Sequence, residues 1–432
     1  MPITSPVWKQ LLYGATIAVG LYAVFIGLQL SPTVQRLALY SHKFNTLFWD
    51  DIHDGEAFGF AKHQVTPFNI VTPDGVTLFG WHILPVNLYA RHEAQIRTEE
   101  RPAGQPVEDF TKTTAYELLT AENLDTKVVV SFHGNAGHIA QGWRKDANRY
   151  LSTASDTHVF TIDYRGFGHS TGTPTEAGVI LDGVTLLDWI MNVAKVDPER
   201  IVIMGQSLGT AVTSAVALHY ADPKNTLVPS EPAEVARVLA SNSDRKPVTF
   251  AGIILAASFV SVPGLMRTYK VAGLISLVAP LKPFPFILDQ LLVQLADTWQ
   301  TGERLAAYYD ALKGSPKLHS GSRSMGSLQL LHAINDADIP YHQTEIICRR
   351  ILGSGDTASQ LKLEGKDGQT LDGSKGPAVL DVNRKDRPRL RFEIVRNGAH
   401  NQIIAYSSVA VAVSRAFQDS FADNHAPQRN KR

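Results

Sequence analysis

The sequence predicts an α/β fold with a mostly parallel, doubly wound sheet, a helical cap and an apolar helix near the amino terminus. Three observations carry this prediction. Short β-rich apolar runs alternate with amphipathic stretches from residue 127 onward, which is typical of strand–helix–strand units. One of these runs leads directly into Gly-Gln-Ser-Leu-Gly at residues 205–209, and residues 11–30 carry no charge.

Composition excludes several classes of protein. The 432-residue chain balances 41 basic with 41 acidic residues, and 44% of its residues are hydrophobic, enough for a sizeable core. Without a basic excess we expect no nucleic-acid partner, and no obligate protein partner is evident. The single cysteine, Cys348, excludes an intrachain disulfide, and no Cys/His cluster has zinc spacing. We therefore expect neither a metal nor another cofactor.

Residues 1–32 are predicted to form a membrane anchor. The uncharged stretch 11–30 has the roughly 20 residues that cross a hydrocarbon core of about 30 Å, and Pro32 ends it. A cleaved signal is the alternative, but its apolar region normally runs about 7–15 residues, and no Ala-x-Ala site follows Leu30. A buried core helix is the third alternative. We expect a single-pass membrane protein whose orientation the flanking charges do not decide.

Beyond the anchor we expect a connector over 33–62, one α/β domain over 63–420 and a polar tail over 421–432. The domain opens with a predicted hairpin around Pro73-Asp74-Gly75. Its expected strands are Lys127–Phe132, Val159–Asp163, Ile201–Gly205, Gly252–Ser258, Leu328–Ala333 and Leu390–Val395, with helices over Val179–Val193, Leu208–Tyr220, Tyr341–Leu352 and Ile403–Phe417.

Three segments interrupt this alternation. Residues 89–126 are polar and are predicted as a surface insertion, whereas 353–388, rich in Gly, Asp, Lys and Ser, are predicted as a solvated loop. Residues 260–312 are rich in Leu, Ile, Phe and Pro and are predicted as the cap. The cap's apolar side chains either line a pocket, lie on a bilayer or pack as an ordinary helical element, and the sequence leaves these alternatives open.

Ser207 is predicted to be a nucleophile. A strand, the Gly-x-Ser-x-Gly segment and a helix follow one another directly, which is the context of a nucleophile elbow. The flanking Gly205 and Gly209 let neighbouring backbone approach the strained turn closely. An ordinary turn serine is the alternative, and the strand before and the helix after it favour the nucleophile.

A serine hydroxyl needs a base to take its proton and an acid to orient that base. After such an elbow the chain order is serine, acid, histidine. Asp336 and Asp338 both follow the strand Leu328–Ala333, where a side chain can reach the crevice above the sheet. The usual position of the acid, three residues before a Val/Ile-Pro pair, favours Asp336, with Asp338 as a helix cap.

His400 is predicted to be the base. It is one of 15 histidines and is distinguished by its place in Gly-Ala-His-Asn, on the loop after the strand Leu390–Val395 and before a helix. His158 and Asp163, in contrast, bracket an apolar strand and are interpreted as strand ends, not as a catalytic pair.

The oxyanion of an acyl-transfer reaction needs two backbone donors. The amide of Leu208, directly after the serine, is one candidate. The other is the amide of Asn135, in the His-Gly-Asn-Ala-Gly segment after the strand Lys127–Phe132. A phosphate-binding loop is the alternative, but Gly-Asn-Ala-Gly matches neither phosphate fingerprint.

With HGNAG, DYRGFG, GQSLG, DADIP and GAHN in this order, the chain resembles the α/β-hydrolase-domain-containing protein 12 and 13 group, which are single-pass membrane serine hydrolases. The resemblance covers roughly residues 63–220 and 328–420. It implies the α/β-hydrolase fold and a triad of Ser207, Asp336 and His400.

The type-12 members of this group hydrolyse lysophospholipids and monoacylglycerols, with the catalytic domain in the endoplasmic-reticulum lumen. The resemblance therefore implies a lipid ester substrate and an endoplasmic-reticulum membrane location. The polar insertions 89–126 and 353–388 are not hallmarks of the group and leave the substrate class open.

Two other kinds of function compete with lipid ester hydrolysis. An acyl-protein thioesterase (depalmitoylase) or a serine peptidase would use the same triad, but no β-propeller repeat precedes the domain and no cysteine lies near the amino terminus for palmitoylation. A non-catalytic hydrolase-fold binding module is disfavoured because every triad position is filled.

Overall fold

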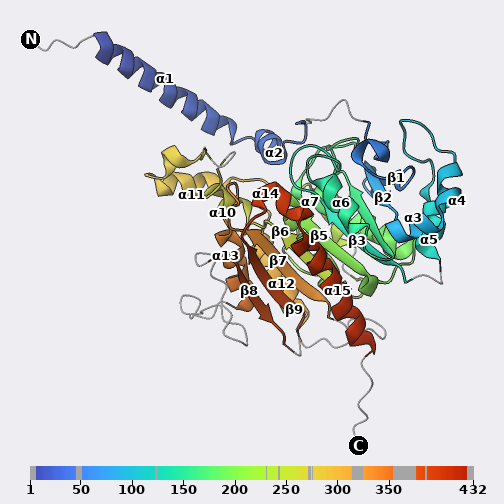
Figure 1. The fold of residues 1–432 in the computed structure, drawn as a ribbon. Coiled ribbons are helices and arrows are strands. Elements are labelled where there is room, and N and C mark those ends of the chain that lie inside the picture. The colour runs from blue at the N-terminus through green and yellow to red at the C-terminus, as the bar shows by residue number, and fades with distance from the viewer. Residues whose placement is uncertain are drawn as a thin grey trace, which may run out of the picture.

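The computed structural model of the protein describes residues 6–44, 51–121, 125–229, 231–241, 244–270, 274, 276–313, 325–353, 376–384 and 387–425. In Figure 1 a central twisted sheet has helices on both sides, and helix α1 projects away from this body.

The described strands form one sheet of nine, in the order β1-β2-β4-β3-β5-β6-β7-β9-β8. The inner strands pair in parallel, whereas β1 and β2 form an antiparallel hairpin at one edge and β8 pairs antiparallel with β9 at the other. This confirms the predicted mostly parallel, doubly wound sheet. The strands are β1 (Val65–Val71), β2 (Thr77–Ile83), β3 (Lys127–Phe132), β4 (Thr157–Ile162), β5 (Ile201–Gln206), β6 (Gly252–Ala256), β7 (Ser327–Ala333), β8 (Ala378–Val382) and β9 (Arg389–Val395).

Both faces of the sheet are buried, so alternate side chains of a strand enter different apolar clusters. On β3, Val128 and Val130 belong to one cluster and Val129 to the other. This is why the inner strands are continuous apolar runs instead of alternating ones. Helices α7 (Glu176–Asn192), α8 (Leu208–Ala221), α12 (Thr301–Ala311) and α13 (His342–Leu352) contribute to the first cluster, and α6 (Arg144–Leu151) and α15 (Ser407–His425) to the second.

Two expectations about the polar segments are wrong in part. Residues 89–126 are not confined to the surface, because Ile96, Phe110 and Leu119 are buried in the first cluster. The solvated loop predicted over 353–388 contains edge strand β8, whose few apolar residues gave too short a pattern; residues 354–375 lie outside the described part. The segment 89–126 holds α4 (Glu93–Thr98), η2 (Phe110–Lys112) and α5 (Thr114–Thr120), after α3 (Val86–Arg91).

The predicted cap divides into two parts with different packing. Its first part holds a small apolar cluster of its own, centred on Val278, Leu288 and Leu292. Helix α12 instead packs in the main core, where Leu305 and Tyr308 are fully buried. The cap therefore ends before α12 and consists of α10 (Val262–Met266), η4 (Ala279–Leu281) and α11 (Pro285–Val293).

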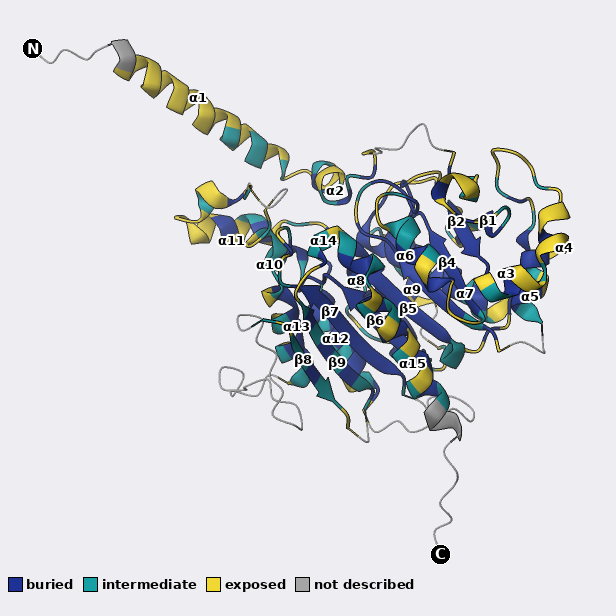
Figure 2. Cartoon of the chain, viewed as in Figure 1, coloured by how far each residue is buried: buried dark blue, intermediate teal, exposed yellow. Residues whose placement is uncertain are grey.

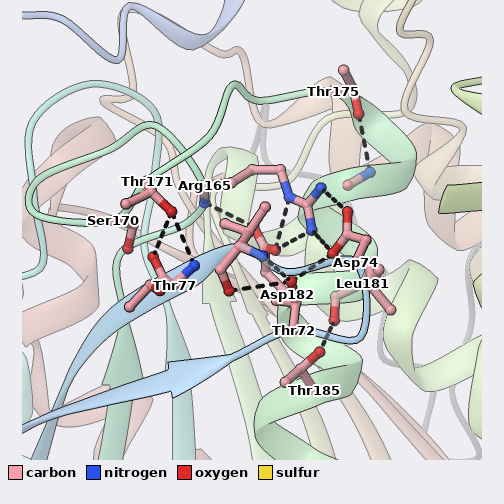
Figure 3. A network of polar contacts seen from close by, with 12 residues as sticks. Thr72, Asp74, Thr77, Arg165, Ser170, Thr171, Thr175, Leu181, Asp182 and Thr185 are labelled. Atoms are coloured by element: carbon pink, nitrogen blue, oxygen red, sulfur yellow. Dashed lines mark hydrogen bonds and ion pairs between the residues drawn. The ribbon is translucent and has the colours of Figure 1, made fainter. Parts of the chain in front are cut away.

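A buried ion-pair network fastens the β1–β2 hairpin to the body (Figure 3). Arg165, after β4, bonds to Asp74 in the hairpin turn at 2.7 Å and to Asp182 of α7 at 2.8 Å. Burial alone would lower the pKa of Arg165, but the two carboxylates outweigh it and raise that pKa. Removing one partner of such a buried network typically costs about 3–5 kcal/mol.

The amino-terminal helices differ in how they meet the body. Helix α1 (Pro6–Leu28) stands away from it, and Trp8–Leu28 has a mean hydropathy of 2.0 with none of that stretch buried (Figure 2). It is long and apolar enough to cross a membrane, and a signal sequence near the amino terminus can meet the same criteria of length and composition. Helix α2 (Pro32–Tyr40) instead docks on the body through ion pairing of Arg36 with Asp297.

The remaining described helices connect or flank these elements. They are η1 (Gly55–Phe58), η3 (Pro198–Arg200), α9 (Ala233–Ala240), α14 (Ala399–Gln402) and η6 (Ile403–Ala405).

Candidate active site

Ser207 lies between β5 and α8 in a left-handed backbone conformation, with φ 54° and ψ −119°. Such a conformation costs a non-glycine residue on the order of 1–3 kcal/mol and persists only where the surroundings hold it. A Cβ on Gly205 would lie 2.1 Å from the carbonyl oxygen of Gly209, and one on Gly209 would lie 2.0 Å from that of Phe132. Both contacts are with backbone, so glycine is required on each side of the serine.

The three predicted triad residues are brought together. His400 Nε2 lies 2.9 Å from Ser207 Oγ, and His400 Nδ1 lies 2.8 Å from Asp336 Oδ2. The Asp336 carboxylate accepts a hydrogen bond from His400 Nδ1–H, which leaves Nε2 unprotonated as an acceptor for the serine hydroxyl. This is the arrangement a general base needs to withdraw the serine proton.

Asp336 and Asp338 have different surroundings. Asp336 Oδ1 accepts hydrogen bonds from the amides of Asp338 and Ile339, at 3.0 and 2.8 Å. Burial alone would raise the pKa of Asp336, but hydrogen bonds from His332 and His400 outweigh it and hold that pKa far below its ordinary value. Asp336 is therefore a carboxylate at neutral pH. Asp338 contributes its amide to this arrangement.

His332 is a neighbour of the triad that sequence reasoning missed. It is fully buried in β7; its Nε2 lies 2.9 Å from the carbonyl of Ile339, and its Nδ1 lies 2.7 Å from the hydroxyl of Thr344. Because a carbonyl only accepts, Nε2 carries the proton, and it also reaches Asp336 Oδ2 at 3.3 Å. His332 thus supports the same carboxylate oxygen that His400 contacts.

The loop that carries Asn135 is held by a single guanidinium group. Arg144 of α6 donates to four carbonyls of the loop, at 2.7 to 3.1 Å: those of Gly134, Asn135, Ala136 and His138. Burial lowers the pKa of Arg144 to about 10, so the group remains charged at neutral pH. With its carbonyls turned toward Arg144, the loop presents Asn135 at the cavity that holds Ser207.

The same loop is fastened to the amino-terminal segment. The amide of Ala136 donates to the carbonyl of Tyr40 at 3.0 Å, and the amide of Gly137 donates to that of Phe44 at 2.9 Å. Leu208 opens α8, where an amide has no acceptor within its own helix. Asn135 and Leu208 both line the same cavity as Ser207, as two donors to an oxyanion must.

Gln206 is a second residue that sequence reasoning missed. Its amide nitrogen donates to the carbonyl of His400 at 2.8 Å, which fixes the histidine loop to the elbow. A Cβ on Gly134 would lie 2.5 Å from Gln206 Oε1, so this side chain also touches the loop of Asn135. The variable position before the serine in the motif therefore joins two parts of the site.

The cavity above Ser207 has a volume of about 520 Å³ and is mostly apolar. That volume falls within the range of about 300–1,000 Å³ typical of small-ligand pockets. Its walls come from the cap, from α2 and from the end of α1, and His400 and Asp338 lie at its base. Several apolar residues in or just before the predicted cap were candidates for lining a pocket or lying on a bilayer. Phe259, Leu265 and Leu277 line the cavity, Val260 is buried but does not line it, Phe284, Phe286 and Ile287 are exposed, and Ile275 lies outside the described residues.

One group of potential metal ligands coincides with the triad. Single ligand atoms of Asp336, Asp338 and His400 lie within 4.8 Å of one another. His400 Nδ1, however, is already hydrogen-bonded to Asp336. The chemistry available here is proton transfer and nucleophilic attack.

His158 in β4 and Asp163 directly after this strand take no part in the triad. His158 Nδ1 lies 2.9 Å from His82 Nε2 in a buried pair, and Asp163 Oδ1 accepts from the amide of Ile139 at 2.7 Å. His158 and Asp163 therefore serve separate contacts, in agreement with their interpretation as strand ends.

Comparison with known proteins supports this architecture. Residues 127–299 match the family described as alpha/beta hydrolase fold. The chain has the α/β-hydrolase fold. It is similar to members of the group that its motifs indicated. Protein bem46 of Schizosaccharomyces pombe is 36% identical over 115 residues, covering 26% of this chain and 38% of that protein.

More distant relatives extend over a longer part of the chain. The lysophosphatidylserine lipase ABHD12 of Danio rerio is 26% identical over 217 residues, covering 49% of this chain and 51% of that lipase. The uncharacterized protein YfhR of Salmonella typhi is 30% identical over 156 residues, covering 36% and 41%. The chain thus matches about half of the length of these relatives or less.

Proposed function

We propose that this protein is a serine hydrolase that cleaves a carboxylic ester of a single-chain lipid, a lysophospholipid or a monoacylglycerol, through an acyl-enzyme at Ser207. The observation that carries the proposal is the hydrogen-bonded series Ser207–His400–Asp336 at the base of a mostly apolar cavity. No step of this chemistry calls for a cofactor.

In the first half-reaction Ser207 Oγ attacks the ester carbonyl carbon while His400 Nε2 takes its proton. The carbonyl oxygen becomes an oxyanion that the amides of Asn135 and Leu208 stabilise. His400 then returns the proton to the departing alkoxide, which leaves as the alcohol, and the acyl group stays on Ser207. Asp336 remains ionised throughout and stabilises the protonated imidazole.

In the second half-reaction water replaces the alcohol. His400 takes a proton from water as it attacks the acyl carbonyl, and the proton then passes to Ser207 Oγ as the acyl–oxygen bond breaks. The products are the fatty acid and the regenerated serine. The same donors serve both oxyanions because the carbonyl oxygen occupies the same position.

The choice of a lipid ester rests on the cavity and on the relatives. Apolar side chains form most of the cavity wall, and they favour an acyl chain over a polar peptide. A relative named as a lysophosphatidylserine lipase is similar over about half its length. We further propose that residues 11–30 anchor the protein as a single-pass span, in the endoplasmic-reticulum membrane by analogy with this group.

A fluorophosphonate probe tests the nucleophile. Wild-type protein is expected to be labelled and Ser207→Ala is not, whereas Ser155→Ala, at an exposed serine outside the cavity, keeps full labelling. Labelling of Ser207→Ala at the wild-type rate would contradict the assignment.

A substrate panel tests the acyl donor. Purified full-length protein is expected to prefer lysophospholipids or monoacylglycerols over acyl-thioesters and peptides. A clear preference for acyl-thioesters would instead favour the acyl-protein thioesterase.

An Asn-x-Ser sequon introduced between residues 354 and 375 reports the side of the membrane, because glycosylation there requires the lumen.

A further inference from the structure

One face of α1 differs from the rest of that helix. Between Trp8 and Leu30 the side chains of Tyr22, Phe25, Ile26 and Gln29 are half-buried, and every other one is exposed. Their spacing of i, i+3, i+4 and i+7 places them on a single face of the helix. This face lies toward the cap, because Tyr22 Oη donates to the carbonyl of Leu277 at 3.0 Å.

This face also reaches the catalytic cavity. Phe25, Ile26 and Gln29 line the same cavity as Ser207 and His400, opposite cap residues of η4 and α11. An apolar helix whose only task is to tether a domain needs no side chain in the active-site wall. Phe25 and Ile26 are apolar and so suit a hydrocarbon chain.

Buried polar contacts fix this position. The Gln35 side chain donates to the carbonyls of Gln29 at 2.7 Å and of Gln294 at 3.0 Å, and its oxygen accepts from the amide of Ala296 at 2.8 Å. Gln35 is only 8% exposed. The Gln35 side chain therefore joins the end of α1, helix α2 and the end of α11. These hydrogen bonds do not depend on apolar packing of α1, most of which is exposed.

The cap surface beside α1 is strongly apolar. Leu274, Phe286 and Val293 are 82%, 74% and 74% exposed, and Phe284 is 57% exposed (Figure 2). At 1.5 Å per residue Tyr22 lies about 9 Å before the end of α1 at Leu28. If α1 spans a bilayer, the contact of Tyr22 with Leu277 therefore holds the cap at the depth of an interfacial helix, roughly 5–10 Å. The continuity of this surface with the α1 span indicates that a lipid bilayer covers it.

We propose that the acyl chain of the substrate enters the site directly from the bilayer, between α1 and the cap, and lies against Phe25 and Ile26 while its ester reaches Ser207. This inference rests on the proposed function and assigns an acyl-chain subsite to the anchoring helix itself. The anchor then selects substrate in addition to holding the domain at the membrane.

The test adds bulk to this wall. Phe25→Trp and Ile26→Trp are compared with Val24→Trp, a neighbour on the same helix that is 61% exposed and does not line the cavity. Full-length proteins in phosphatidylcholine nanodiscs are assayed with oleoyl-glycerol and with water-soluble p-nitrophenyl butyrate. The kcat/KM for oleoyl-glycerol divided by that for p-nitrophenyl butyrate is expected to fall about 10-fold in Phe25→Trp and Ile26→Trp, the wall variants. In Val24→Trp this ratio is expected to stay within about 2-fold of wild type.

A second variant guards against misfolding. Ile26→Ala enlarges the subsite and is expected to shift the chain-length optimum toward longer acyl chains. An unchanged ratio in both tryptophan variants together with an unchanged optimum in Ile26→Ala overturns the inference. An equal fall of the ratio in Val24→Trp also overturns the inference.

The acyl-chain subsite and the proposed function are overturned by different results. Loss of oleoyl-glycerol hydrolysis in Ser207→Ala, with no change of ratio in the wall variants, overturns the subsite and leaves the proposed function intact. Hydrolysis that survives in Ser207→Ala overturns the proposed function itself.

Discussion

The proposed catalytic floor and the proposed lipid-facing wall of the same cavity are built in different ways. The floor comprises Ser207, Asp336, His400 and the Asn135 loop, and backbone geometry and hydrogen bonds hold it at the carboxyl ends of the strands. The wall comprises α1, α2 and the cap, whose side chains are largely exposed and whose cluster of buried residues is small.

This contrast separates chemistry from selection. On the floor, the backbone around Ser207 is closely packed, since Gly205 and Gly209 leave no space for a side chain. Wall residues can change size without touching the reacting atoms. We therefore expect substitutions in the floor to lower the turnover of every ester, and substitutions in the wall to change which esters are turned over.

The largest effect is expected at Asp336. Asp336→Asn removes the charge that orients His400 and stabilises its protonated form, so kcat is expected to fall about 10⁴-fold for long and short esters alike. Asp338→Asn is the matched control and is expected to stay within a few-fold of wild type, measured by steady-state kinetics. A large loss in Asp338→Asn together with a small loss in Asp336→Asn would exchange the roles of the two aspartates.

The next largest effect is expected at Arg144. Arg144→Met leaves four loop carbonyls without their donor, so the Asn135 amide loses its fixed position and kcat falls about 10²–10³-fold. The fluorophosphonate labelling rate is expected to fall as well, because the phosphonyl oxygen uses the same donors. Arg149→Met, on the same helix, is the control. Wild-type labelling of Arg144→Met would show that the loop holds its position without the guanidinium.

A smaller and selective effect is expected where the wall meets the body. Asp297 pairs with Arg36 and accepts from Tyr40 Oη at 2.8 Å, so Asp297→Asn weakens the seat of α2 by about 2 kcal/mol. Hydrolysis of oleoyl-glycerol is expected to fall about 10-fold, more than that of a butyrate ester. Asp289→Asn, in an exposed cap ion pair, is the control. Equal losses of activity on both esters would mean that Asp297 supports the catalytic floor and not the wall.

The smallest effect on activity is expected at a site in neither region. Burial lowers the pKa of His158 to about 3 and holds that of His82 far below its ordinary value. Both are bases with depressed folded-state pKa values, so the unfolded chain takes up protons first and stability falls as pH drops from about 6.5 toward 3. The loss of stability from His158 accumulates over that window, and His82 adds to it in the same direction.

Replacing this pair removes the acid sensitivity that it causes. The double variant His82→Leu/His158→Leu is expected to lose less of its Tm between pH 7 and pH 5 than wild type does, with esterase activity unchanged. His342→Leu, whose side chain is 61% exposed, is the control. An unaltered slope in the double variant would mean that the pair does not titrate in this range.

The catalytic floor could largely be predicted from the sequence. Each of its groups directly follows a strand, and the parallel arrangement collects the carboxyl ends of strands at one edge. Local patterns around Ser207, Asp336 and His400 were therefore enough to expect them to meet, and the structure places them within hydrogen-bond distance.

Arg144, His332 and Gln206 were not predictable in the same way. Their contacts depend on what the fold places beside them, and nothing in the sequence around Arg144 distinguishes it from an ordinary helical arginine. Helix α2 lies in the segment that was expected to be a plain connector. Its role could not be predicted, because it depends on contacts with Asp297 and Gln294, more than 250 residues away. Edge strand β8 and the buried residues of 89–126 were missed because polar neighbours dilute their apolar pattern.

We propose that a lipid acyl group is carried on Ser207 while its chain occupies the cavity. Rapid quenching of full-length protein during turnover of oleoyl-glycerol, followed by peptide mass spectrometry, detects such an intermediate. An oleoyl ester is expected on the peptide that contains Ser207, accumulating before steady state and absent in Ser207→Ala. An acyl group on another residue, or steady turnover without any acyl-enzyme in wild type and with activity kept in Ser207→Ala, would contradict the proposal.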